Sequence, residues 1–405
     1  MEFQFKLPDR DLWREKIISE LKENRDRIFF KNDIEQIEFD ITTKTSNSFD
    51  FSDNRKSNQW KNCFKIEVKD EIQANQICLK ALMQGADSLY FEIYSSNTDW
   101  NKLFKDIQFE YIGAQILISN RNQLDSFEKF VRENKIQNID LIIDPLISGF
   151  EKSDYKSALL NGFELQQIGA NTWQEIGILL STFHEILLND GTKFHFHLGI
   201  GQNYFLEIAK IRSLKWLCYY LCDIYQLSPE IQFSAEVGFM NKSLKDPHTN
   251  LLRQTTEAMA AISGGVSELI IRPYDDLSTK GSNDFSRRMA LNISNILKEE
   301  SYFDFVKDPL KGSHIIELLT EIITLKAWVF LKSLDEFKSI NGTSKIDHIT
   351  NIISETRNQR LELFNQDKLE LIGVNSFINS KEETNSWTNE KTYLGLTYLI
   401  FENCD

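Results

Sequence analysis

The sequence predicts an α/β fold and, within that class, a (β/α)8 barrel of the TIM type. Between residues 61 and 340, short apolar runs rich in β-branched residues alternate with longer stretches whose apolar residues recur every three or four positions. Eight such runs fall within about 280 residues, which is the usual length of an eight-unit barrel. A doubly wound parallel sheet is the second architecture that fits this alternation.

The strands are expected where the apolar runs lie. In chain order they are Cys63–Val68, Ser88–Ile93, Gln115–Ser119, Ile139–Asp144, Phe163–Ile168, Phe194–Leu198, Ile231–Val237 and Ser267–Arg272. The helices between them are expected where one side of a helical turn pattern is apolar. They are Glu71–Gln84, Asp125–Asn134, Asn171–Leu188, Asn203–Gln226 and Asn250–Ser263.

The segments on either side of the barrel have a different character. Residues 1–60 begin with an amphipathic helix at Asp11–Asn24 and continue as a polar stretch with little material for a core, which indicates an arm or linker. Residues 341–405 contain a helix at Lys345–Leu363, polar segments and a short apolar run at Tyr393–Phe401. We expect this extension to pack on the barrel or on a partner.

Composition excludes several functions and locations. The 405 residues include 46 Lys and Arg against 60 Asp and Glu, and this net charge of −14, without a dense basic run, argues against nucleic-acid binding. The most apolar helical stretch, Trp216–Leu227, is interrupted by Asp223 and is shorter than the roughly 20 residues that span a bilayer. A charged N-terminus without an apolar signal core, and five cysteines without a CxxC pair, favour the cytoplasm.

One polar cluster is a candidate site on the residues alone. His195 and His197 alternate on one expected strand and therefore point the same way, and Glu164 lies on the preceding strand. Such a group suits acid/base chemistry or a metal ion. The competing interpretation is a polar filling of the barrel interior with mutual hydrogen bonds.

Four longer motifs occur in a fixed order along the chain. They are GIGQNYFLEIAKIRSLKWL at 199–217, DPHTNLLRQTTEAMAAISGG at 246–265, FSRRMALNISNILKEES at 285–301 and DPLKGSHIIELLT at 308–320. Together they make the chain resemble the barrel domain of the methylmalonyl-CoA mutase family, and in particular a small (beta) subunit. Looser resemblance at Asp11–Leu21, Ala74–Gly85 and Leu371–Asn375 extends the match over most of the chain.

The resemblance implies a barrel that belongs to an acyl-CoA mutase. In this family adenosylcobalamin generates a radical that interconverts methylmalonyl-CoA and succinyl-CoA in propionate metabolism, while the protein orients and shields the reacting groups. It also implies which residues form the retained scaffold. These are Gly162, Gln166, Gly169, Ala170, Gly238, Asp246, Pro247, Asn250, Arg253, Gly264, Gly265, Asp308, Pro309, Gly312, Ser313 and Glu317.

The chain departs from the family where the family places substrate-facing polar residues. Phe163 stands at a Tyr position, which removes a hydroxyl donor, and Glu164 stands at a His position, which sets an anion against a carboxylated thioester. Four further polar positions are apolar here. They are Ile231, Phe233, Ala235 and Ile270. We therefore expect this chain to supply no catalytic, cofactor-binding or metal-binding residue.

The family's cobalt-binding signature, DxHxxG, is also missing. The nearest match is Asp246 and His248, with Leu251 where Gly is required, and the stretch after Leu371 is too short for a cobalamin domain. The resemblance thus implies a non-catalytic subunit of a heterodimer whose large (alpha) subunit holds adenosylcobalamin.

Two other functions remain open. The first is an independent barrel enzyme with a new acid/base or metal site at Glu164, His195 and His197, on the face where barrel enzymes bind substrate. The second is an acyl-CoA binder that regulates without turnover. For a partner, the candidate surfaces are the arm at 1–60 and the tail after residue 376, because both are amphipathic and poor in core residues.

Overall fold

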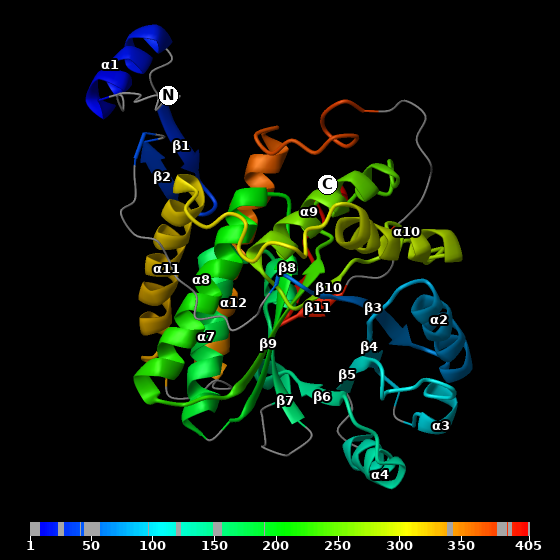
Figure 1. Ribbon diagram of the computed structural model, residues 1–405. Coiled ribbons are helices and arrows are strands. Elements are labelled where there is room, and N and C mark those ends of the chain that lie inside the picture. Colours follow the sequence, from blue (N-terminus) through cyan, green and yellow to red (C-terminus); the bar gives the residue numbers. More distant parts are fainter. Residues whose placement is uncertain are drawn as a thin grey trace, which may run out of the picture.

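The centre of the molecule is a closed barrel of eight parallel strands in the order β10-β3-β4-β5-β6-β7-β8-β9 (Figure 1). This computed structural model describes residues 9–22, 28–40, 42–43, 57–95, 97–118, 123–148, 156–189, 191–337, 343–378, 387 and 391–403. The strands are β3 (Lys61–Val68), β4 (Ser88–Ile93), β5 (Gly113–Ile118), β6 (Ile139–Ile143), β7 (Lys156–Asn161), β8 (Lys193–Ile200), β9 (Glu230–Val237) and β10 (Glu268–Ile270). The predicted (β/α)8 barrel is confirmed.

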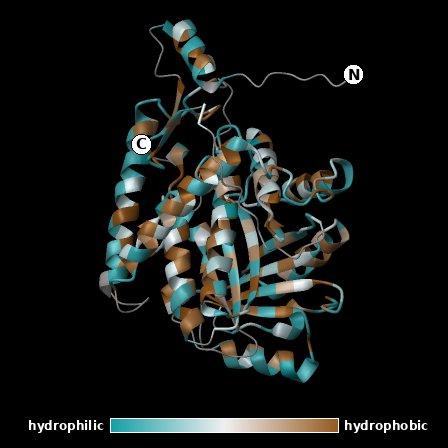
Figure 2. Cartoon of the chain, turned by 60° about the vertical axis from the view of Figure 1, so that its left-hand side comes forward, coloured by the Kyte–Doolittle hydropathy of each residue, from teal (hydrophilic) through white to brown (hydrophobic). Residues whose placement is uncertain are grey.

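Helices surround the barrel and cover its outer side (Figure 1). They are α2 (Glu71–Met83), α3 (Trp100–Leu103), α4 (Leu124–Asn134), α5 (Pro145–Ser148), α6 (Gly162–Gln167), α7 (Thr172–Leu188), α8 (Tyr204–Tyr225), α9 (Thr249–Gly264), α10 (Asp284–Asn295) with η3 (Ile296–Glu300), α11 (His314–Leu334) and α12 (Thr343–Asn365). Helix α11 packs on the outside of α7 and α8 as an additional layer. Bands of apolar and polar residues alternate along these helices (Figure 2).

Seven of the eight predicted strands overlap the observed ones, and the fifth prediction is wrong. The fifth strand is β7, one segment earlier than expected, and Phe163–Ile168 forms most of helix α6 and its C-cap. The helix begins there because the Asn161 side chain caps it, accepting a hydrogen bond from the backbone N–H of Glu164 at 3.4 Å. Residues expected inside the sheet therefore lie beyond its carboxyl edge.

The N-terminal arm contains a hairpin that the sequence did not predict. Strands β1 (Phe29–Asn32) and β2 (Ile37–Asp40) pair antiparallel, and the turn between them buries Ile34 and Glu35. The Glu35 carboxylate accepts the backbone N–H of Thr172 at 3.0 Å, which attaches the hairpin to the start of α7. Helix α1 (Arg10–Leu21) instead stands away from the barrel (Figures 1 and 2).

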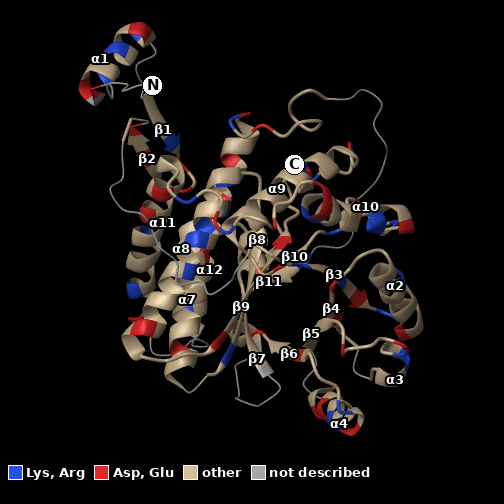
Figure 3. Ribbon diagram, in the orientation of Figure 1, with Lys and Arg blue, Asp and Glu red and all other residues tan. Residues whose placement is uncertain are grey.

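The core lies mainly between strands and helices. Phe194 and Phe196 of β8 pack on Phe183 of α7, with ring centroids 4.6 and 5.4 Å apart. Inside the barrel a smaller apolar group is formed by Cys63, Tyr90, Ile142, Leu159 and Ile270. Among the described residues, no helix is long and apolar enough to cross a bilayer. Lys, Arg, Asp and Glu are interspersed over the outer helices (Figure 3).

The C-terminal segment crosses the carboxyl face of the barrel. Residues 391–403 include the short pair β11 (Thr392–Tyr393) and β12 (Leu396–Thr397). The backbone N–H of Leu399 donates to the carbonyl of Gln167 at 2.7 Å, and that of Phe401 donates to the carbonyl of Met240 at 3.0 Å. The segment is thus fixed to the end of α6 and to the loop that follows β9, at the end of the barrel where enzymes of this fold bind substrate.

Candidate functional site

The upper interior of the barrel contains a buried network of charges. Lys65 on β3 lies 2.7 Å from a carboxylate oxygen of Glu92 and 2.8 Å from one of Glu236. Arg272, just after β10, lies 3.4 Å from the other oxygen of Glu236. Burial alone would raise the pKa of Glu236, but the nearby Lys65, His197 and Arg272 outweigh it and lower that pKa. Each of these charged groups therefore has a partner of opposite charge within the network.

The two candidate histidines meet at one serine. His195 Nε2 and His197 Nδ1 lie 2.6 and 2.8 Å from the hydroxyl of Ser234 on β9, and His197 Nε2 lies 2.9 Å from Glu236. Burial lowers the pKa of His195 to about 3, with a smaller contribution from His197, so its imidazole is neutral near pH 7.

Glu164, the third member of the expected cluster, has a different partner. It lies on α6, where its carboxyl group hydrogen-bonds with the hydroxyl of Tyr398. Burial raises the pKa of Glu164 to about 7, although this hydrogen bond lowers it. Within the described part of the chain, no group of three or more His, Cys, Asp or Glu side chains is placed to hold a metal ion.

The positions that differ from the family divide into two groups. Phe163 is buried at the barrel mouth, where its ring lies 5.8 Å from that of His197. Ile270 is buried in the barrel interior. Phe233 lies on the other side of its strand, because its ring packs on Phe196 and on Tyr219 of α8. Ala235 belongs to the same outer core, and Ile231 packs against it. The side chains of β9 that enter the interior are Gln232, Ser234 and Glu236.

The C-terminal segment closes the mouth with three polar side chains. Lys391 pairs with Glu67 at the end of β3 and lies 4.0 Å from Glu92. The Tyr393 hydroxyl donates to Asp144 at 2.8 Å, and Tyr398 bonds to Glu164. Burial raises the pKa of Asp144 to about 6, although the Tyr393 hydrogen bond lowers it. These contacts were not predicted from the sequence, in which the apolar run at Tyr393–Phe401 is their only signal.

The retained motifs connect loops to helices. Asn250 donates to the carbonyls of Ser243 at 2.7 Å and Tyr274 at 3.2 Å, which joins the loops after β9 and β10. Arg212 on α8 lies buried between Asp308 and Glu317, with 2.8 Å to the latter, and so anchors the start of α11. These contacts position the outer layer and the loops at the mouth.

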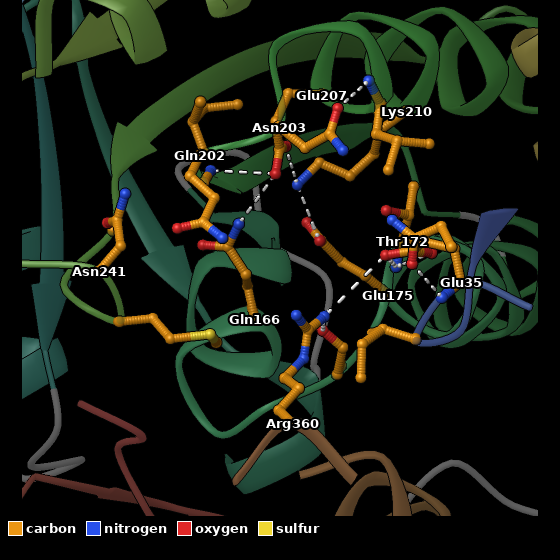
Figure 4. A pocket seen from close by; sticks show the side chains of 18 of the residues that line it. Glu35, Gln166, Thr172, Glu175, Gln202, Asn203, Glu207, Lys210, Asn241 and Arg360 are labelled. Atoms are coloured by element: carbon orange, nitrogen blue, oxygen red, sulfur yellow. Dashed lines mark hydrogen bonds and ion pairs between the residues drawn. The ribbon is translucent and has the colours of Figure 1, made fainter. Parts of the chain in front are cut away.

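A separate cavity of about 420 Å³ lies beside the mouth, between the β1–β2 hairpin, α6, α12 and the loop after β8 (Figure 4). Lys210 of α8 lies at its base, 3.0 Å from Glu175 and 2.6 Å from Glu207. Burial raises the pKa of Glu175 to about 8 despite the adjacent Lys210. The retained Gln166 also lines the cavity and donates to Glu207 at 3.4 Å. This pocket was not predicted from the sequence, although Lys210 lies in one of the four motifs.

A sequence model of the methylmalonyl-CoA mutase family matches residues 151–393, which is more than half of the chain. The chain belongs to this family. A methylmalonyl-CoA mutase small subunit of Porphyromonas gingivalis is 28% identical over 94% of this chain and 71% of its own length. Methylmalonyl-CoA mutases of Escherichia coli and Homo sapiens are 26% and 28% identical over 57% and 56% of this chain. The chain spans only 34% and 32% of their lengths.

Similarity to solved structures is low. A wild-type HPPK-DHPS of Plasmodium falciparum with pterin and p-hydroxybenzoate has a TM-score of 0.37 and 14% identity, and covers 73% of this chain and 56% of its own. A dihydropteroate synthase of Xanthomonas albilineans has a TM-score of 0.29 and 11% identity, over 60% of this chain and 93% of its own. Neither value supports an argument about function.

The family to which this chain belongs is cobalamin-dependent. A corrin ring placed over the barrel mouth would occupy the face that residues 391–401 cover. Lys391 and Tyr393 are bonded there to Glu67 and Asp144, and the ring of Phe163 packs on those of Phe239 and Tyr398. The cofactor does not fit the described residues in this arrangement.

Proposed function

We propose that this chain is the non-catalytic small (beta) subunit of a cytoplasmic methylmalonyl-CoA mutase. It pairs as a heterodimer with a large (alpha) subunit that holds adenosylcobalamin and the acyl-CoA and carries out the rearrangement. The observation that carries the proposal is the closure of the barrel mouth by residues 391–401, through Lys391, Tyr393 and Tyr398. A cytoplasmic location is supported by the four described cysteines, which are all buried and unpaired.

The chemistry at the closed mouth supports the same conclusion. A carboxylated thioester entering the barrel needs cationic or hydrogen-bond-donating partners, but Lys65 and Arg272 are already paired with Glu92 and Glu236. Phe163 offers no hydroxyl to such a substrate. Displacing these ion pairs would leave buried carboxylates without partners, at a cost of several kcal/mol.

The test is a turnover assay on the purified chain with adenosylcobalamin and methylmalonyl-CoA. We expect no succinyl-CoA from this chain alone, no binding of labelled CoA, and cofactor-dependent turnover once the large chain from the native host is added. Cofactor-dependent turnover by this chain alone would overturn the proposal. The same assay on a lysate from which this chain has been depleted controls for turnover by the large chain without it.

One observation favours a second candidate, an independent barrel enzyme. Glu164 has a pKa raised to about 7 by burial, a suitable value for a general acid or base at neutral pH, and it lies near the barrel mouth. Under this hypothesis Glu164→Gln abolishes an activity of the isolated chain while Glu185→Gln, on an outer helix, leaves it unchanged. Metal analysis of the purified chain would test a metal at His195 and His197.

A further inference from the structure

Helix α11 is apolar on both its inner and its outer side. Its inner side is buried against α7 and α8, and its outer side carries Leu318, Ile322, Leu325 and Val329 at intervals of four, three and four residues. Leu325 and Val329 are 60% and 68% exposed. A surface helix normally carries polar residues on the side that faces away from the core. The outer stripe of α11 is therefore a surface that the described residues of this chain leave open.

Helix α8 extends this surface. Its Tyr220 and Ile224 are 42% and 50% exposed, and the Tyr220 ring stacks on Trp216 at 5.1 Å. Tyr220 also meets Trp328 of α11, with ring centroids 5.9 Å apart, so the aromatic side chains join the two helices. We call the surface formed by Tyr220, Ile224, Leu325, Trp328 and Val329 the α8–α11 face. Figure 2 turns this side of the molecule toward the reader.

The size of the face suits a protein partner. Its four most exposed residues present roughly 450 Å² of accessible surface, more than half of the about 800 Å² per partner in a standard interface. The largest apolar patch of a typical monomeric protein measures about 300–600 Å² and often marks an interaction site. Rings of Trp and Tyr are also the side chains most enriched at interface centres.

We propose that the α8–α11 face binds the large chain of the heterodimer, through the apolar faces of the corresponding helices of that chain's barrel. This inference rests on the proposed function. The family match spans residues 151–393 and so includes both helices, which means that a partner of the same family has equivalent helices to offer. A second copy of this chain is a poorer occupant, because two chains of net charge −14 repel each other.

Helix α1 supports this assignment from outside the face. It stands away from the barrel (Figure 1), with Leu12 and Trp13 exposed by 65% and 47%. A helix of twelve residues is marginal in water without a packing partner. An arm that reaches out from the barrel is suited to hold the same large chain from a second side.

The experiment compares two double variants with the same charge change. Leu325→Glu with Val329→Glu places two carboxylates in the α8–α11 face, and Leu252→Glu with Phe305→Glu, at sites 71% and 72% exposed elsewhere, is the matched control. Each tagged chain is expressed in the native host, the co-purifying chain is identified by mass spectrometry, and the affinity for the purified large chain is measured by biolayer interferometry. Melting temperatures establish that both variants fold, and Tyr220→Ala is the milder substitute if the first does not.

We expect the face variant to bind the large chain on the order of 100-fold more weakly, and the control within threefold of wild type. Equal affinity of both variants would overturn the assignment of this face while leaving the heterodimer intact. Absence of any large chain from the wild-type preparation would overturn the proposed function itself. A wild-type homodimer that the face variant dissociates would replace the large chain by a second copy as the occupant, and so overturn the proposal.

Discussion

Replacing Tyr393 by Phe removes one hydroxyl group and leaves the ring that packs in the barrel mouth. The hydroxyl is buried and lies 2.8 Å from the carboxylate of Asp144, which is also buried. Loss of a hydrogen bond to a buried polar group costs about 1–3 kcal/mol, because the remaining partner keeps its desolvation penalty. The perturbation therefore measures how firmly residues 391–401 are attached.

The cost should depend on pH. The folded pKa of Asp144 is about 6, above the ordinary 3.8, because burial outweighs its hydrogen bonds. When burial raises the pKa of an acid in the folded state, the unfolding free energy of the protein falls as pH rises from the unfolded pKa to the folded pKa. For Asp144 the shift in pKa corresponds to a loss of about 3 kcal/mol at pH 8. Without the Tyr393 hydroxyl the folded pKa rises further, so the loss extends to higher pH. We expect Tyr393→Phe to lower the unfolding free energy by about 1 kcal/mol at pH 5.5 and by about 2–3 kcal/mol at pH 8.0.

The assay is equilibrium unfolding in urea at pH 5.5 and 8.0, followed by circular dichroism, on wild type, Tyr393→Phe and Tyr111→Phe. Tyr111 is 79% exposed and serves as the control for the loss of a hydroxyl at the surface. A loss for Tyr393→Phe that is equal at the two pH values would refute the role of Asp144. A loss no greater than that of the control would refute the anchoring of the segment.

Three further predictions concern the arm, the side cavity and the outer layer. Deleting residues 1–30 should weaken binding of the large chain more than it lowers the melting temperature; equal losses, measured by pull-down and calorimetry, would make the arm part of the core. Burial raises the pKa of Glu175 to about 8, so between about pH 4.5 and 8 the folded state holds a proton that the unfolded state has lost, and the unfolding free energy falls as pH rises. Glu175→Gln should remove this part of the pH dependence. A pH profile in urea unfolding that is the same as that of wild type would contradict the prediction. Arg212→Met leaves Asp308 and Glu317 without their shared cation and should cost about 3–5 kcal/mol, with Arg212→Lys only a partial rescue; the melting temperatures of the two variants test the order.

Much of the fold was predictable because the alternation of apolar runs and helical stripes is a local property of the sequence. The fifth strand was not, because Lys156–Asn161 offers only a run of three apolar residues. The apolar residues of Phe163–Ile168 are of types that also occur in strands. The Asn161 side chain caps a helix that begins at Gly162, but a cap at this position can be predicted only once the end of the preceding strand is known. The β1–β2 hairpin was missed for a related reason: its four-residue strands are too short for a periodic pattern.

The site was less predictable than the fold. His195 and His197 share a side of β8, as their spacing predicts, and the competing interpretation as a hydrogen-bonded interior filling agrees with their bonds to Ser234. The substitution at Phe233 removes no donor from the interior, because that residue faces α8. The closure of the mouth joins Tyr393 to Asp144 across 249 positions, and no local pattern encodes a contact of that range.

The position of Lys391 also has a consequence for how the protein is made. Its partner Glu67 precedes it by 324 residues, so the first barrel strands leave the ribosome long before the segment that covers them. Until that segment is synthesised, the charged interior of the nascent barrel is open to water and to other molecules of the cell. The completion of this face is thus a late event in biogenesis, and a chain stalled before residue 391 would present a barrel without its cover.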